Sequence, residues 1–129
     1  MTQHHFHAVV WIDHHEARIF HVAPDGLDES TVPAPHKHVH RHPRGGEGYK
    51  AHPDDVQRFF REVAHDLEGA TEVLILGPST AKLQFIRYAQ SHDAALYSHI
   101  VGVETVDHPT DPQISAYAKH YFETTASTH

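Results

Sequence analysis

The sequence predicts an α/β protein with a mixed sheet of about five strands covered by helices. Two observations predict this class. Two apolar runs near the N-terminus are separated by His14-His15, as in a β-hairpin. A later run, Val73–Leu76, stops at Gly77-Pro78, and an amphipathic segment follows at once, as where a buried strand enters a helix. The expected order is β-β-β-α-β-α-β-α, and the length of 129 residues suits one domain over 1–129.

The first half of the chain holds the expected antiparallel part of the sheet. His7–Asp13 reads as a buried strand and Glu16–Ala23 as the strand that returns beside it. Pro24-Asp25-Gly26 supplies the chemistry of a turn. We expect residues 27–35 to form a loop, and His36–His42 to form a third, more polar strand at a sheet edge.

Helices and strands alternate in the second half. Six apolar residues recur at helical spacing after Asp54 or Asp55 and predict a helix that ends at Glu68-Gly69: Val56, Phe59, Phe60, Val63, Ala64 and Leu67. The strand Val73–Leu76 and a helix over Ser79–Ser91 come next. A strand over Ile100–Val106 and a helix over Asp111–Phe122 complete the pattern, and residues 124–129 are expected to be a frayed tail.

Composition favours a cytoplasmic globular protein. Hydrophobic residues make up 39% of the chain, but no apolar run approaches the roughly 20 residues that a membrane span needs. The N-terminus lacks the basic and apolar regions of a signal peptide. The chain has no cysteine, so thiolate metal sites and cysteine nucleophiles are excluded. A formal charge of −7 argues against a dedicated binder of duplex DNA.

Histidine is unusually frequent, with 17 residues. His36, His38, His40 and His42 alternate, so a strand there would place all four on one face. We take His36, His38 and His40 as candidate ligands for zinc or nickel, since imidazoles on one face suit such metals. The other interpretation is a solvated strand face. We expect no resident cofactor, and captured zinc or nickel would be adventitious.

The predicted start of a helix after Gly77 is a candidate anion site. Ser79 and Thr80 lie where free backbone N–H groups favour a negative charge, and Lys82 adds a cation one turn later. Gly77 ends the preceding strand. The spacing is not that of a P-loop. Ordinary capping of the helix by Ser or Thr is the alternative.

Three stretches carry a resemblance to a known family: the hairpin Val9–Phe20, the strand–turn–helix segment Leu74–Phe85, and the strand Val101–Val106 before a helix. In this order they resemble the middle domain of the eukaryotic and archaeal peptide-chain release factor and of Pelota. The bacterial single-domain relatives are often labelled translational machinery proteins. The resemblance covers about residues 7–122 and implies an RNase H-like α/β fold.

The chain departs from this family in a glycine-rich loop. Release factors carry Gly-Gly-Gln there, and the glutamine helps water to attack the peptidyl-tRNA ester. The corresponding residues here are Arg44, Gly45, Gly46 and Glu47. A carboxylate donates no hydrogen bond and brings a negative charge, and both properties oppose the role of the glutamine. A plain surface loop is the alternative interpretation.

The resemblance therefore implies a binding module of the translation apparatus that contacts the ribosome or tRNA, for example in rescue or dormancy, without hydrolytic chemistry. Arg41, Arg44 and Lys50 supply local positive charge for phosphate contacts. Two alternatives stay open. One is a metal-dependent nuclease of the same fold, with Asp13, Glu16 and Asp107 as ligands. The other is metal storage or sensing by the histidine-rich strand together with His4, His5 or His7.

Overall fold

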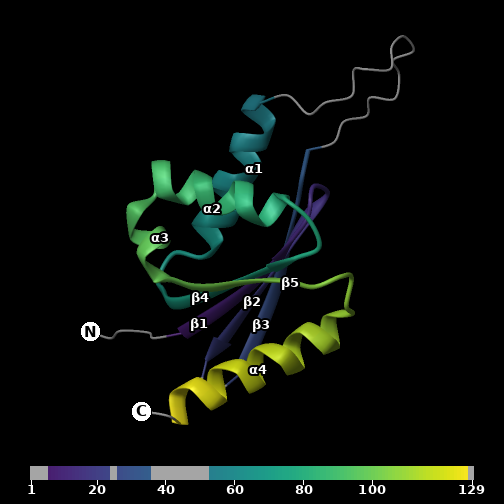
Figure 1. The fold of residues 1–129 in the computed structure, drawn as a ribbon, viewed down its shortest axis with the longest axis vertical. Coiled ribbons are helices and arrows are strands. Elements are labelled where there is room, and N and C mark those ends of the chain that lie inside the picture. The colour runs from purple at the N-terminus through teal and green to yellow at the C-terminus, as the bar shows by residue number, and fades with distance from the viewer. Residues whose placement is uncertain (1–5, 24–25, 36–52, 128–129) are drawn as a thin grey trace.

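The predicted sheet is present and it is mixed. In the computed structural model, which describes residues 6–23, 26–35 and 53–127, five strands lie in the order β3-β2-β1-β4-β5 (Figure 1). Their bounds are β1 Phe6–Ile12, β2 Glu16–Ala23, β3 Gly26–Pro33, β4 Ala70–Gly77 and β5 Ile100–Thr105. β1 pairs antiparallel with β2 and parallel with β4, and β4 pairs parallel with β5. The predicted α/β class with a mixed sheet is thereby confirmed.

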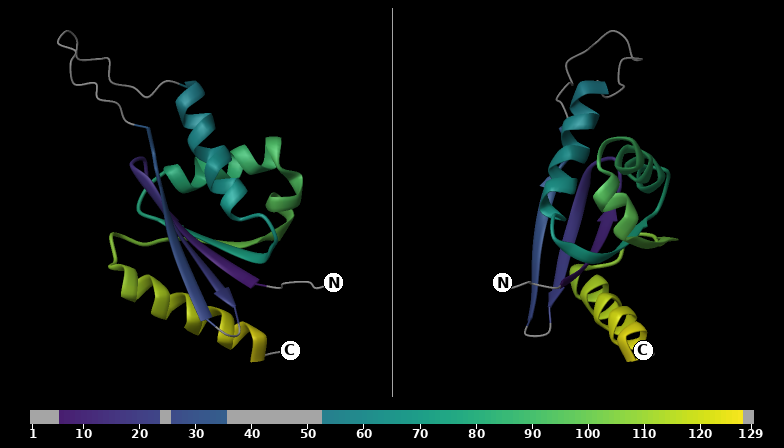
Figure 2. Two further views of the ribbon diagram at one scale, coloured as in Figure 1. Left: turned by 180° about the vertical axis from the view of Figure 1, so that it is seen from behind. Right: turned by 90° about the vertical axis from the view of Figure 1, so that its left-hand side faces the viewer.

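Helices cover both faces of this sheet. Their bounds are α1 Pro53–Asp66, α2 Ala81–His92, α3 Ala94–His99 and α4 Asp111–Ser127. The first three pack on one face, and α4 packs alone on the other (Figures 1 and 2). Within the described residues, no helix is long and apolar enough to cross a membrane.

The central strand β1 is buried on both faces. Its alternate residues Ala8, Val10 and Ile12 join the core under α1 and α2. Val9 and Trp11 point the other way and join the core under α4. A strand covered on both sides reads as a continuous apolar run, which is why this segment was recognisable in the sequence.

The third strand differs from the prediction. We expected Gly26 to belong to a turn and residues 27–35 to form a loop. Instead, residues 26–33 pair with all of β2, from Ala23 opposite Gly26 to Glu16 opposite Pro33. The segment is polar because β3 is an edge strand, with only Leu27 and Val32 packed against the two cores. The expected third strand, His36–His42, lies outside the described residues.

Two further elements differ from expectation. The short helix α3 was not predicted, and it begins where the Asp93 carboxylate accepts a hydrogen bond from the Leu96 N–H at 3.2 Å. The last helix, α4, continues to Ser127, past the end expected at Phe122. Residues 124–127 of the expected tail therefore belong to this helix, and residues 128–129 lie outside the described residues. Gly69 has φ 90°, which explains why the chain turns there after α1.

A tyrosine links α4 to the edge of the sheet. The Tyr117 hydroxyl donates a hydrogen bond to the Glu104 carboxylate of β5. This bond, burial of the hydroxyl and the negative charge of Glu104 raise the pKa of Tyr117 from its ordinary value of 10.0 to about 12. The folded state therefore favours the protonated phenol.

We expect this raised pKa to make the protein alkali-sensitive. A raised pKa stabilises the fold fully below pH 10, and this contribution is lost as the pH rises from about 10 to about 12. Urea unfolding across this range measures the loss, and Tyr117→Phe should flatten it. Tyr97→Phe, at an exposed tyrosine of α3, is the control and should leave the dependence unchanged. Equal pH dependence in the wild type and Tyr117→Phe would contradict the assignment.

Candidate functional site

The residues of the predicted anion site lie together between β4 and α2. Gly77 ends β4, and Thr80 is the N-cap residue of α2. Gly77 is required by close packing, because a Cβ atom there would collide with the carbonyl oxygen of Ile12 at the end of β1. The Thr80 side chain makes no capping hydrogen bond, whereas its carbonyl accepts from the N–H groups of Leu83 and Gln84.

Lys82 points into this turn instead of outward. The residue is only 6% exposed, and its Nζ donates to the Ser79 carbonyl oxygen at 2.7 Å. The ammonium group therefore holds the β4–α2 connection closed. An anion at this helix start would be held by backbone N–H groups, with the Lys82 charge behind them.

Replacing Lys82 by Met should expose this structural role. Met keeps much of the buried aliphatic stem but leaves the Ser79 carbonyl without its charged donor. We expect the free energy of unfolding to fall by about 1–3 kcal/mol, the range for leaving a buried acceptor without its hydrogen bond. Urea denaturation measures it, with Lys119→Met on α4 as the control. An unchanged stability would contradict the inward-facing role.

Two other predicted sites cannot be placed. The candidate metal ligands His36, His38 and His40 and the glycine loop with Arg44, Gly45, Gly46 and Glu47 lie outside the described residues. They remain predictions from the sequence.

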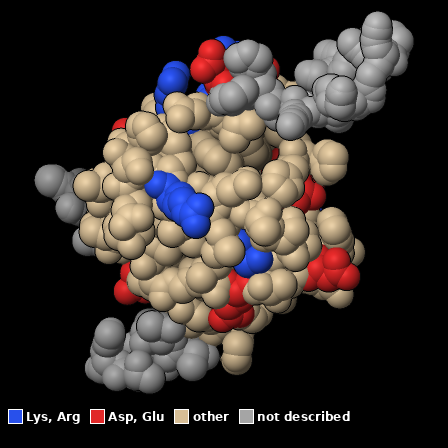
Figure 3. Space-filling model, turned by 45° about the horizontal axis from the view of Figure 1, so that its top comes forward, with Lys and Arg blue, Asp and Glu red and all other residues tan. Residues whose placement is uncertain are grey.

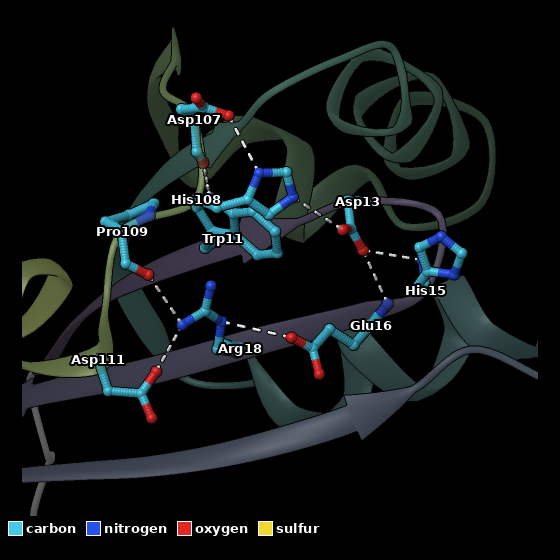
Figure 4. Close-up of polar contacts among 9 residues, drawn as sticks. All are labelled: Trp11, Asp13, His15, Glu16, Arg18, Asp107, His108, Pro109 and Asp111. Carbon is cyan, nitrogen blue, oxygen red and sulfur yellow. Dashed lines mark hydrogen bonds and ion pairs between the residues drawn. The ribbon is translucent and has the colours of Figure 1, made fainter.

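A polar cluster, of which the sequence pointed only to Asp13, Glu16 and Asp107, lies where β1 and β5 end (Figure 4). We call it the Trp11 cluster, and it consists of Trp11, Asp13, Glu16, Arg18, Asp107, His108 and Asp111. The Trp11 side chain is 1% exposed, and its Nε1 donates to the Asp107 carbonyl at 2.8 Å. The Arg18 guanidinium lies 4.4 Å from the Trp11 ring centroid, in cation–π geometry.

Arg18 connects the cluster to the start of α4. Its guanidinium donates to Asp111 Oδ1 at 2.7 Å and to the Pro109 carbonyl at 3.2 Å, and Glu16 Oε2 lies 3.5 Å from its Nε. One arginine thus joins β2, the β5–α4 connection and α4. Both hydrogen bonds come from Nη1, and the buried Nε has no hydrogen-bond partner among the described residues, so Arg18 serves as a structural clamp through Nη1.

His108 lies between two aspartates. Its Nδ1 is 3.0 Å from Asp107 Oδ1, and its Nε2 is 3.7 Å from Asp13 Oδ2. The other oxygen of Asp13 accepts from the backbone N–H groups of His15 and Glu16 at 2.8 and 3.0 Å, which closes the β1–β2 turn (Figure 4). The imidazole ring is also 5.2 Å from the Trp11 ring.

This arrangement does not favour the nuclease alternative. The three carboxylates expected to bind metal ions are otherwise engaged: Asp13 by backbone N–H groups, Glu16 by Arg18 and Asp107 by His108. A two-metal centre needs carboxylates that converge on ions about 4 Å apart. In the described ranges, no three histidine, aspartate or glutamate side chains are placed to hold one ion.

Comparison with known proteins finds likeness in structure only. No family model and no curated protein matches the sequence. Among solved structures, Pelota from Archaeoglobus fulgidus is similar with a TM-score of 0.61 and 16% identity, over 92% of this chain and 32% of that one. Pelota from Thermoplasma acidophilum has a TM-score of 0.58 and 20% identity, over 91% and 33% of the two chains.

The archaeal translation termination factor aRF1 is also similar. Its TM-score is 0.55 at 11% identity, over 95% of this chain and 42% of aRF1. The chain thus spans about a third of the Pelota chains and less than half of aRF1. Identities this low establish a shared fold alone. The chain therefore has the fold of one segment of Pelota and aRF1, in agreement with the resemblance that its hairpin and strand–helix junction carry.

Proposed function

We propose that this protein is a translation-associated binding module that contacts the ribosome or tRNA and does not hydrolyse peptidyl-tRNA. The observation that carries the proposal is the match of 95% of the chain to part of a translation termination factor. A cytoplasmic location follows from such a function.

The absence of hydrolysis is argued from Glu47. At the position where the resemblance places the catalytic glutamine, this chain has glutamate after Gly45-Gly46. A carboxylate cannot donate the amide hydrogen bond, and its charge would oppose a developing oxyanion. We therefore expect purified protein to release no peptide from peptidyl-tRNA on ribosomes.

Co-sedimentation tests the proposed partner. Tagged protein from lysates of growing and of starved cells is centrifuged through sucrose at low and at high salt. We expect enrichment with ribosomal particles or with tRNA at low salt and loss at high salt, because phosphate contacts release counterions. The Trp11→Ala variant, which we expect to be largely unfolded, measures how much protein sediments by nonspecific trapping. Absence of enrichment in both growth states would reject the proposal.

The alternating histidines predict a pH dependence of this binding. Unperturbed histidine titrates near pH 6.5, so His36, His38, His40 and His42 would gain positive charge beside Arg41 as the pH falls. We expect affinity for tRNA to rise between about pH 7.5 and 6. Replacing all four by Gln should abolish the rise, whereas His65→Gln together with His120→Gln should not. Filter binding measures it, and an affinity that is flat across this range would contradict the prediction.

A further inference from the structure

A groove separates α1 from α2 on the face of the sheet opposite α4. Its volume is about 480 Å³, within the range of about 300–1,000 Å³ that is typical of sites for small molecules. Gln57 and Phe60 of α1 line one side, and Gln84, Arg87, Tyr88 and His92 of α2 line the other.

Aromatic rings form much of its wall. The Tyr88 ring stacks on His92, with centroids 4.7 Å apart and planes 16° apart. Phe60 lies 5.8 Å from Tyr88, so its ring supports Tyr88 from the side of α1. Tyr88 is half-buried, and part of its surface remains open to the groove. A supported, partly open ring of this kind is a stacking surface for a planar ligand.

The charge of the groove runs against that of the whole chain. The formal net charge is −7, yet no aspartate or glutamate is among the described residues that line this groove. Arg87 lines it, is exposed, and makes no ion pair with another described residue. On the face shown in Figure 3, acidic side chains lie mainly toward the margin and basic ones stand isolated. The groove therefore presents an uncompensated cation beside an aromatic surface.

Two amide side chains complete the lining. Gln57 and Gln84 come from the two facing helices. Gln84 is held in place by His14 of the β1–β2 turn, with 3.3 Å between Oε1 and Nε2. An amide can both donate and accept hydrogen bonds, as the edge of a nucleobase requires. An apolar peptide helix would leave these amides and Arg87 without partners.

We propose that this groove binds an unpaired nucleotide of RNA, with the base stacked on Tyr88, the base edge at the amides of Gln57 and Gln84, and the phosphate at Arg87. The proposal rests on the proposed function and deepens it by naming where single-stranded RNA is held. A base inside a duplex is already stacked and paired, so the site selects single strands, loops and ends.

Fluorescence anisotropy with the purified full chain tests this site. The probes are a short labelled single-stranded RNA and the same RNA annealed to its complement. Removing one base-stacking ring by Tyr88→Leu should weaken single-strand binding roughly tenfold, and Tyr88→Phe should retain it. Arg87→Gln should reduce the slope of log K against log salt by about 0.7, the value for one phosphate contact on a single strand.

Matched variants decide between the groove and the general surface. Tyr97→Leu removes an exposed tyrosine of α3, and Lys119→Gln removes a cation of α4 on the other face of the sheet. Both should bind RNA like the wild type. Equal losses in Tyr88→Leu and Tyr97→Leu would overturn the proposal, and so would duplex binding as tight as single-strand binding.

The two proposals fail in different ways. If the purified chain binds single-stranded RNA through Tyr88 but does not sediment with ribosomes or tRNA, the groove stands and the partner proposal falls. If the chain sediments with ribosomes and Tyr88→Leu binds RNA like the wild type, only the groove is rejected.

Discussion

Replacing Trp11 by Ala is expected to lower the free energy of unfolding by about 3–5 kcal/mol, as for other fully buried aromatic residues. The side chain is 1% exposed and packs in the core under α4. Its removal also takes away the face over which Arg18 lies and the donor to the Asp107 carbonyl. Since a domain of this size is only marginally stable, we expect the variant to be largely unfolded near 37 °C.

A second variant separates the packing of Trp11 from its hydrogen bond. Trp11→Phe keeps an aromatic face but loses the Nε1 donor, so a smaller loss of about 1–2 kcal/mol is expected. Urea unfolding followed by far-UV circular dichroism measures both variants, because Trp11 is the only tryptophan and its fluorescence is lost in each. Equal stability of Trp11→Ala and the wild type would show that the Trp11 cluster does not support the fold.

Replacing Gly77 by Ala is expected to cost about 3 kcal/mol, at the upper end for overpacking. The added Cβ would collide with the backbone oxygen of Ile12, and a backbone atom in the central strand cannot move aside cheaply. The effect should also reach the turn that Lys82 closes.

Gly26→Ala is the matched control. A Cβ at Gly26, the first residue of β3, meets nothing within 4 Å. Its stability should therefore stay within about 0.5 kcal/mol of the wild type, as for ordinary surface substitutions. Thermal and urea unfolding of the pair measure the difference. Similar losses at the two positions would mean that glycine is needed at Gly77 for some reason other than the approach of β1.

Several elements could be predicted because their signals are local. The hairpin of β1 and β2 was recognisable from two apolar runs around a two-residue turn, and its register places Arg18 opposite Trp11. Helix α1 follows from apolar residues at helical spacing, and its end from Gly69. The junction of β4 and α2 follows from the apolar run before Gly77.

The third strand could not be predicted for a physical reason. Gly26–Pro33 has only Leu27 and Val32 as partly buried apolar residues, so its hydrophobic pattern is too weak to mark a strand. It becomes a strand because the outer edge of β2 needs hydrogen-bond partners, and the turn after Ala23 brings this segment beside it. The alternating histidines at 36–42 form a clearer period-2 pattern than residues 26–33, so the third strand was predicted at 36–42.

The candidate sites also depend partly on local sequence signals and partly on tertiary packing. The junction after Gly77 is present, with α2 beginning at Ala81 and not at the expected Ser79, and the anion site itself stays a prediction. The direction of Lys82 depends on a carbonyl three residues earlier and on the packing of α2, which no spacing rule contains. The groove between α1 and α2 was not predicted at all. Its lining joins Phe60 to Tyr88, and only the packing of the two helices on the sheet brings these residues together.

The sequence by itself determined the α/β class, the hairpin and the junction at Gly77, because each depends on periodicity or turn chemistry within a short stretch. Only the tertiary structure decided which polar side chains meet. Trp11 and Asp107 are 96 residues apart, and Arg18 and Asp111 are 93 apart. Such contacts arise when β1 and β5 end at one edge of the sheet and α4 crosses beneath it, an arrangement that no local pattern encodes.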